Sequence, residues 1–235
     1  MTSHIYNEIN QVISDDDLYS AFNKFIFSND VRVIGKLLQR YKFFEKIIDL
    51  PGDIVELGVF KGSGIATWIK FIELNCTYSN KRVIGFDLFD AHNTIIENYE
   101  NGDKMQIVYK RVDKDDLSLE SVENNLNKLA SSTKKHILVK GDVVETTKDF
   151  TKNNPGLRIA LLYIDVDLCE PTYHGLKNLW NHIIPGGYIV FDEYEFHKFD
   201  ESNGVDKFLK EFNIPYNIKS TNALGPTAYM IKKDF

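Results

Sequence analysis

The chain has 235 residues, of which 43% are hydrophobic and 26% are charged, and its formal net charge is −6. This composition is typical of a globular protein with enough apolar surface for a sizeable core, and it excludes an intrinsically disordered chain. The acidic balance argues against a nucleic-acid partner, because phosphate backbones are bound by clustered Lys and Arg.

The two cysteines, Cys76 and Cys169, have no metal-type spacing, so neither a disulfide framework nor a zinc site is predicted. Residues 1–16 lack the basic start and apolar run of a secretory signal, and no segment approaches the roughly 20 apolar residues that span a bilayer. We therefore expect a cytoplasmic protein with no membrane partner. A homodimer is expected only because such dimers are common.

The first fifty residues predict two helices. Acidic residues at positions 15–17 can cap a segment that ends near Phe27, and Asn29 with Asp30 can cap a second one. The second segment carries apolar residues at helical spacing between Val31 and Ile48. We expect both helices to form a layer that precedes the sheet.

From residue 53 onward, short β-type runs alternate with amphipathic helical stretches. Strands are predicted at residues 54–57, 83–86, 136–139, 159–164, 188–191, 216–218 and 228–231, and helices at 65–74, 119–129, 143–150, 172–183 and 204–212. This order predicts an α/β fold: a doubly wound, mostly parallel, seven-stranded sheet with an antiparallel edge strand and helices on both faces. We expect one domain over residues 1–235, with a lid in the polar insertion at residues 91–117.

A glycine-rich turn follows the first predicted strand, in the run DIVELGVFKGSG at residues 53–64. The strand ends in Glu56, and ligands of open α/β sheets bind at such strand ends near the topological switch point. Gly58, Gly62 and Gly64 allow a close backbone approach, and free amides at the helix start favour an anion. The run lacks the Gly-Lys-Ser/Thr of a P-loop. A tight turn without a ligand is the alternative interpretation.

Two further predicted strands also end in acids. Asp87 follows the second strand and is placed to accept both hydroxyls of a ribose, or to cap a helix. Asp142 follows the third strand and is placed to face an adenine edge, or to cap the helix that begins at Val143. Three successive strand ends with Glu56, Asp87 and Asp142 favour a nucleoside ligand.

The fourth and fifth predicted strands are apolar and run into carboxylates. Asp165 follows the fourth strand, and Asp192 and Glu193 follow the fifth. Neighbouring strand ends would bring these like charges together, and burial would raise their pKa values in the absence of a cation. A hard divalent cation, above all Mg²⁺, binds such oxygen ligands. The alternative is that these acids cap helices or point into solvent.

Four segments of the chain together resemble a known family. They are GDIVELGVFKG at residues 52–62, IGFDLFD at 84–90, LLYIDVDLCEPT at 161–172 and PGGYIVFDEY at 185–194. Their order and spacing are similar to those of the macrocin, mycinamicin and novobiocin type (TylF-like) of sugar O-methyltransferases. The resemblance implies a class I methyltransferase (Rossmann-like) fold, S-adenosylmethionine and a divalent cation as cofactors, and a sugar hydroxyl as the acceptor in polysaccharide or natural-product biosynthesis.

The resemblance also implies roles for individual residues. The methionine end of the cofactor would lie at Glu56, Gly58, Gly62 and Ser63, the ribose at Asp87, the adenine at Asp142, and the metal at Asp165, Asp192 and Glu193, with Asp165 bordering the cofactor as well. Two positions depart from the family pattern. Glu193 stands where Asp is more common, and Cys169 stands where an aromatic residue is common.

Methyl transfer from a sulfonium requires an oriented acceptor whose hydroxyl loses a proton. Asp165 is the first candidate for the general base, with His197 and His174 as rivals because histidine titrates near neutral pH. A dinucleotide-dependent (NAD(P)) oxidoreductase would share the first turn and Asp87, but hydride transfer does not need the acidic cluster. A non-catalytic nucleoside-binding protein remains a further alternative, as does a catechol-type acceptor.

Overall fold

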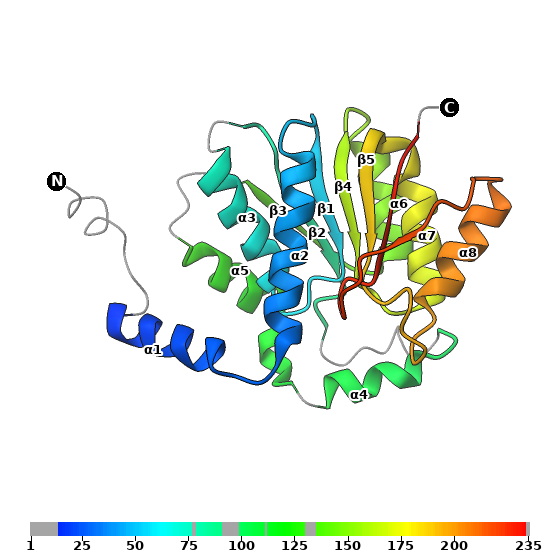
Figure 1. Cartoon of the computed structure of the whole chain (residues 1–235). Helices are drawn as coiled ribbons and strands as arrows, with labels where there is room; N and C mark the ends of the chain where they lie inside the picture. Colours follow the sequence, from blue (N-terminus) through cyan, green and yellow to red (C-terminus); the bar gives the residue numbers. More distant parts are fainter. Residues whose placement is uncertain (1–13, 77–78, 91–98, 111, 130–134, 234–235) are drawn as a thin grey trace.

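The computed structural model describes residues 14–76, 79–90, 99–110, 112–129 and 135–233. Its centre is a seven-stranded sheet with the order β3-β2-β1-β4-β5-β7-β6, and helices cover both faces (Figure 1). The strands are β1 (Asp53–Leu57), β2 (Val83–Asp87), β3 (His136–Lys140), β4 (Ile159–Ile164), β5 (Ile183–Phe191), β6 (Lys219–Ser220) and β7 (Ala228–Ile231). The predicted doubly wound sheet is confirmed.

Strands β1 to β5 are parallel, and β7 is antiparallel to both of its neighbours. The antiparallel strand therefore lies one position in from the edge, and the short β6 forms the edge itself. The strand order reverses between β1 and β4, which are hydrogen-bonded neighbours. The crevice at the carboxyl ends of these two strands is the place where open α/β sheets bind ligands.

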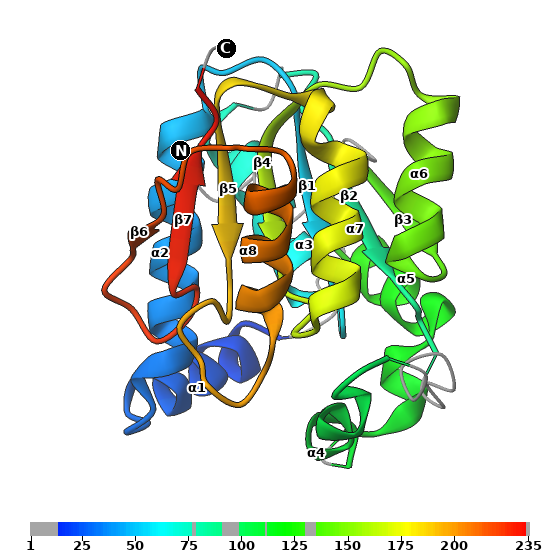
Figure 2. The same cartoon turned by 90° about the vertical axis from the view of Figure 1, so that its right-hand side faces the viewer.

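Each face of the sheet packs against its own group of helices, as the two views together show (Figures 1 and 2). The bounds of the long helices are α1 (Asp15–Ile26), α2 (Val31–Ile47), α3 (Ser63–Asn75), α5 (Leu119–Asn127), α6 (Val143–Asn153), α7 (Cys169–Leu179) and α8 (Glu201–Glu211). One core joins the sheet to α6, α7 and α8, and a second joins it to α2, α3 and α5. Burial on both faces explains why the central strands read as continuous apolar runs.

Only one of the two N-terminal helices belongs to these layers. Asp30 caps α2, which buries Phe43, Phe44 and Ile47 in the second core. Helix α1 is capped by Ser14 rather than by the predicted acids at 15–17, and its described side chains are exposed or half-buried. The expected helical layer is therefore supplied by α2, while α1 leads away from the body of the molecule (Figure 1).

Two segments differ from the sequence prediction. The strand predicted at residues 216–218 is wrong: β6 begins at Lys219, because the turn that closes from the Thr221 amide to the Thr227 carbonyl pairs Ser220 with Ala228. The insertion at 91–117 contains short helices, η2 (Gly102–Met105), α4 (Gln106–Tyr109) and η3 (Lys114–Leu117), whereas no element was predicted there. Residues 91–98 and 111 of this insertion lie outside the described residues.

The helix predicted at residues 172–183 divides into α7 and a turn of 3₁₀ helix, η4 (Trp180–His182), and β5 starts directly after it. No helix in the described part of the chain combines the length and the apolar character that crossing a membrane requires.

Candidate functional site

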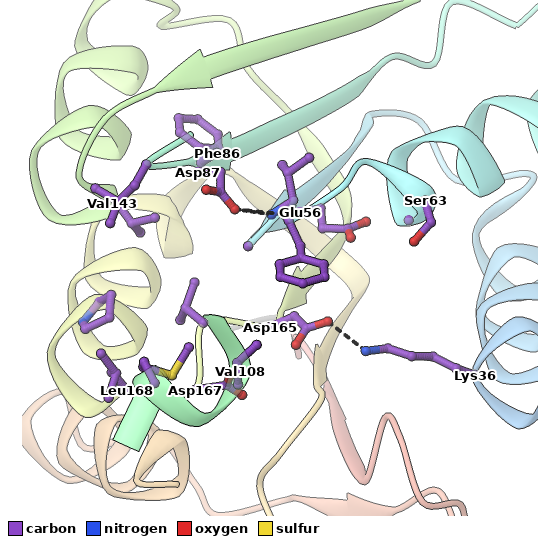
Figure 3. A pocket seen from close by; sticks show the side chains of 18 of the residues that line it. Lys36, Glu56, Ser63, Phe86, Asp87, Val108, Val143, Asp165, Asp167 and Leu168 are labelled. Atoms are coloured by element: carbon purple, nitrogen blue, oxygen red, sulfur yellow. Dashed lines mark hydrogen bonds and ion pairs between the residues drawn. The ribbon is translucent and has the colours of Figure 1, made fainter. Parts of the chain in front are cut away.

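A cavity of about 500 Å³ opens at the carboxyl ends of the central strands (Figure 3). It is framed by the residues that follow β1, β2, β3 and β4, by one side of α2, and by part of the insertion. Of the residues predicted to bind a cofactor, those that line the cavity are Glu56, Gly58, Ser63, Asp87, Asp142 and Asp165. Gly62 does not line it and instead precedes α3 in a left-handed conformation with φ of 85°.

The glycine-rich turn is shaped by a carboxylate from the next strand. The Asp87 carboxylate accepts hydrogen bonds from the Val59 and Phe60 amides at 2.7 and 2.9 Å, and from the Phe89 amide at 2.9 Å. Burial raises the pKa of Asp87, and these three amides oppose that rise. The Val59 and Phe60 amides, which precede the helix start, are thus bound by Asp87, which holds the turn against the cavity.

Gly58 cannot be replaced without strain. Its φ is +88°, and a Cβ atom there would collide with the carbonyl oxygen of Asp165. Gly58, which follows β1, thus lies against Asp165, which follows β4, as expected at a switch point.

Asp142 performs the helix-capping role that the sequence left open. Its carboxylate accepts the Val144 amide at 2.9 Å at the start of α6, and it also accepts the Tyr99 hydroxyl. Tyr99 comes from the insertion and lines the cavity together with Met105, Val108 and Tyr109. The insertion therefore closes one wall of the cavity, next to Asp142.

Glu56 is bound on the inner wall by groups that the sequence analysis did not consider. The Arg40 guanidinium of α2 donates to both of its carboxylate oxygens, at 2.9 and 3.1 Å, and the Trp68 indole N–H donates at 2.6 Å. The side chains of Arg40 and Glu56 are only 7% and 2% exposed. Such a buried pair is stable only when both charges are matched, as they are here.

The same arginine connects this pair to the acids after β5. Its guanidinium lies over the Tyr163 ring, 4.0 Å from the ring centre, and the Tyr163 hydroxyl donates to Asp192. Burial, followed by the charge of Asp192, raises the pKa of Tyr163 well above its usual value, so this tyrosine is a hydrogen-bond donor. A continuous polar chain therefore runs from Trp68 to Asp192 beneath the cavity.

A lysine lies between two of the three acids that were predicted to bind a metal. The Lys36 Nζ atom donates to Asp165 and to Asp192, at 2.8 Å each; its contact with Asp165 is visible in Figure 3. Within the described residues, no group of three or more His, Cys, Asp or Glu side chains is arranged to hold a metal ion. The predicted cluster of Asp165, Asp192 and Glu193 is therefore not assembled around a shared point; instead, two of its members share an ammonium group.

The acids around Lys36 retain an excess of negative charge. Burial, and next the charge of Asp165, raise the pKa of Asp192 to about 6. Burial and the charges of Asp192 and Asp165 raise the pKa of Glu193 to about 7. Burial, then Asp165, raise the pKa of Asp167 well above its usual value, and Asp167 lines the cavity with a φ of 63°. The single positive charge of Lys36 does not balance the negative charge that these acids would carry if all were ionised.

Neither histidine considered as a general base borders the cavity. His197 is exposed and contacts the Phe196 ring, and His174 lies 3.5 Å from Glu170 on α7. Both lie outside the cavity lining, whereas Asp165 and Asp167 belong to it. Carboxylates, and not these two imidazoles, therefore border the cavity.

Four members of the site were not predicted from the sequence: Lys36, Arg40, Trp68 and Tyr163. One signal was available: Lys36 and Arg40 are four residues apart, and the apolar spacing of α2 places Arg40 among buried positions. Charged residues four apart share one helix face. Nothing local, however, indicated which acids that face would meet.

Comparisons with known proteins give matches in both sequence and fold. Residues 36–227 match the sequence model of a family described as "Macrocin-O-methyltransferase (TylF)". The chain is 26% identical over 166 residues to the demethyldecarbamoylnovobiocin O-methyltransferase of Streptomyces niveus. The matched region covers 71% of this chain and 61% of that protein. It is 26% identical over 145 residues to the 8-demethyl-8-(2,3-dimethoxy-alpha-L-rhamnosyl)-tetracenomycin-C 4'-O-methyltransferase of Streptomyces olivaceus, covering 62% and 54%. The chain thus spans less than two thirds of the length of these relatives.

The fold is also similar to that of a solved protein. CalS11, described as a calicheamicin methyltransferase and as a TDP-rhamnose 3'-O-methyltransferase, superposes with a TM-score of 0.72 at 23% identity. The superposition covers 96% of this chain and 88% of CalS11.

Proposed function

The chain belongs to the macrocin O-methyltransferase family and has the class I methyltransferase fold, and on this premise we propose that it is an S-adenosylmethionine-dependent O-methyltransferase acting on a hydroxyl of a small, sugar-like acceptor. The observation that carries the proposal is the cavity at the switch point, which is lined by acids at the carboxyl ends of four parallel strands, β1 to β4. The family match argues against the oxidoreductase alternative.

We assign the cofactor to the part of the cavity between the glycine-rich turn and the insertion. In this proposal the methionine end lies near Glu56, Gly58 and Ser63, with Gly62 shaping the turn. Asp87 and Asp142 face the ribose and the adenine. The apolar wall formed by buried Met105 and half-buried Leu88 and Val108 supports this assignment, because a flat base needs apolar contacts on its faces.

A sugar-like acceptor is supported by the printed names of the relatives, two of which mention rhamnose. It would enter beside Asp165 and Asp167, at the end of the cavity that Lys36, Val33 and Leu37 of α2 border. Asp165 is proposed to accept the hydroxyl proton, because a candidate base must lie within hydrogen-bonding reach of the acceptor. The apolar residues of α2 would exclude water from this end.

Assistance by Mg²⁺ is part of the proposal; its support is the chemistry of the carboxylate donors, because no cluster of three ligands is preformed among the described residues. Oxygens of Asp165 and Asp192 already converge on one positively charged group, and Glu193 follows Asp192 directly. Carboxylate oxygens are the ligands that Mg²⁺ prefers. When bound, the cation would act as a Lewis acid that lowers the proton affinity of an acceptor hydroxyl. Lys36 would then have to leave its present position.

The cofactor assignment predicts micromolar binding of S-adenosylhomocysteine that depends on Asp87. Asp87→Ala should weaken this binding at least about tenfold, because it removes a charged hydrogen-bond acceptor and releases the Val59 and Phe60 amides. Isothermal titration of the wild type and the variant measures the change. Asp149→Ala, at an exposed position on α6, is the matched control and should bind like the wild type. No heat of binding with the wild-type protein would refute the assignment.

The acceptor assignment predicts methyl transfer to deoxyhexoses. Incubation with methyl-labelled S-adenosylmethionine and a panel containing TDP-rhamnose, a rhamnosyl glycoside and a catechol should label a sugar member of the panel. Chelation with EDTA should abolish the labelling, and Mg²⁺ should restore it. Mass spectrometry detects the added methyl group. Labelling of the catechol alone would show that the acceptor is a catechol and not a sugar. Methyl transfer that persists in EDTA would show that the reaction needs no divalent cation.

A further inference from the structure

The position of Lys36 carries a consequence for cation binding. Its Nζ atom lies 2.8 Å from one oxygen of Asp165 and 2.8 Å from one oxygen of Asp192, so a single point is shared by both carboxylates. An ammonium group is the ordinary state of a lysine side chain near neutral pH, and here it meets two carboxylates. The lysine is therefore a cation at the place where the two acids converge.

An ammonium group and a metal ion cannot share this point. A divalent cation bound by the same two oxygens would need the space that Nζ occupies, and like charges at such short range repel strongly in a partly buried site. Asp192 is the fixed member of the pair, because its side chain is 4% exposed and its other oxygen accepts the Tyr163 hydroxyl. Lys36 is the member that can move, because its side chain is 35% exposed and has a path to solvent.

The helix that carries Lys36 need not move for the lysine to leave. Arg40, one turn further along α2, is held by both oxygens of buried Glu56. Phe43, Phe44 and Ile47 anchor the same helix in the core. Rotation about the bonds of the flexible lysine side chain is therefore sufficient to free the two acids.

We propose that Lys36 and a divalent cation are alternative occupants of the position between Asp165 and Asp192, so that Lys36 lowers the affinity of the site for the cation. This inference deepens the proposed function at the same site. The lysine neutralises the two acids while the cation is absent, and the cation expels it on binding. Because a binding-competent state that is only partly populated weakens the apparent affinity by that fraction, a lysine in place about nine-tenths of the time costs about tenfold in affinity.

Titration of the 235-residue chain with Mn²⁺ alone, in which the electron paramagnetic resonance of free Mn²⁺ is measured, tests this competition without any turnover. Lys36→Met, which removes the charge and keeps the length of the side chain, should bind Mn²⁺ about tenfold more tightly than the wild type. Lys42→Met is the matched control: it removes the same charge from an exposed position on the same helix and should leave the affinity unchanged within about twofold. Lys36→Met/Asp192→Asn should lose the gain.

Thermal melting gives a second readout. Without a cation, Lys36→Met leaves Asp165 and Asp192 unpaired and should melt below the wild type; saturating Mn²⁺ should raise its melting temperature more than that of the wild type. Equal or weaker Mn²⁺ binding by Lys36→Met would overturn the proposal. So would the absence of Mn²⁺ binding in both proteins, since the position would then belong to the lysine alone.

The proposed function is judged by different data on the same preparations. Loss of S-adenosylhomocysteine binding would refute the methyltransferase assignment and leave the Mn²⁺ result standing. Conversely, cofactor binding and methyl transfer without a gain of Mn²⁺ affinity in Lys36→Met would refute only the competition.

Discussion

Asp165→Asn should lower kcat for methyl transfer by about 10²- to 10⁴-fold, the range expected when a general base is lost. Asp165 is the acid that both lines the cavity and contacts Lys36, so it borders the acceptor and belongs to the proposed cation site. The substitution keeps the size of the side chain, and Lys36 retains Asp192 as a partner. The fold should therefore survive, and S-adenosylhomocysteine affinity should change far less than kcat.

The measurement is steady-state methyl transfer to the best acceptor of the deoxyhexose panel, with Asp149→Asn as an exposed control. Asp167→Asn is the informative comparison, because Asp167 lines the same cavity two residues away. Asn tolerates the left-handed backbone that Asp167 adopts, so this variant should also fold. If Asp167→Asn loses the greater part of kcat while Asp165→Asn retains it, the base is Asp167 and our assignment is wrong.

Arg40→Met should lower the free energy of unfolding by about 3–5 kcal/mol, the usual cost of removing one partner from a buried ion pair. The substitution keeps the aliphatic length of the side chain but leaves Glu56, which is 2% exposed, with the Trp68 N–H as its remaining donor. A loss of this size is a large share of the stability of an ordinary domain. The substitution would also disturb the cavity, because Arg40 and Glu56 both line it.

Chemical denaturation measures this loss. Adding Glu56→Gln to Arg40→Met should recover most of the stability, since a neutral amide no longer leaves a buried charge unpaired. Lys42→Met, on the exposed side of α2, should change the free energy of unfolding by less than about 0.5 kcal/mol. A loss below about 1 kcal/mol for Arg40→Met would contradict the view that this pair anchors α2.

The agreement between sequence and structure is best where function depends on strand ends. Glu56, Asp87 and Asp142 each follow a short apolar run, and such runs identify parallel strands whose carboxyl ends share one edge of the sheet. Local order along the chain was therefore sufficient to bring these acids to one cavity. Asp165 and Asp192 are close for the same reason: they follow β4 and β5, which are neighbouring parallel strands.

The sequence by itself determined the sheet, its helical layers, the glycine-rich turn and the family, because periodicity, strand order and short motifs are local properties. Only the tertiary structure decided which positive charge those acids meet. Lys36 is 129 residues from Asp165 and 156 from Asp192, and Arg40 reaches Glu56 from α2 across the second core. Those contacts depend on how α2 packs and turns against the sheet, and that orientation is set by the fit of Phe43, Phe44 and Ile47 into the core, which no local pattern specifies.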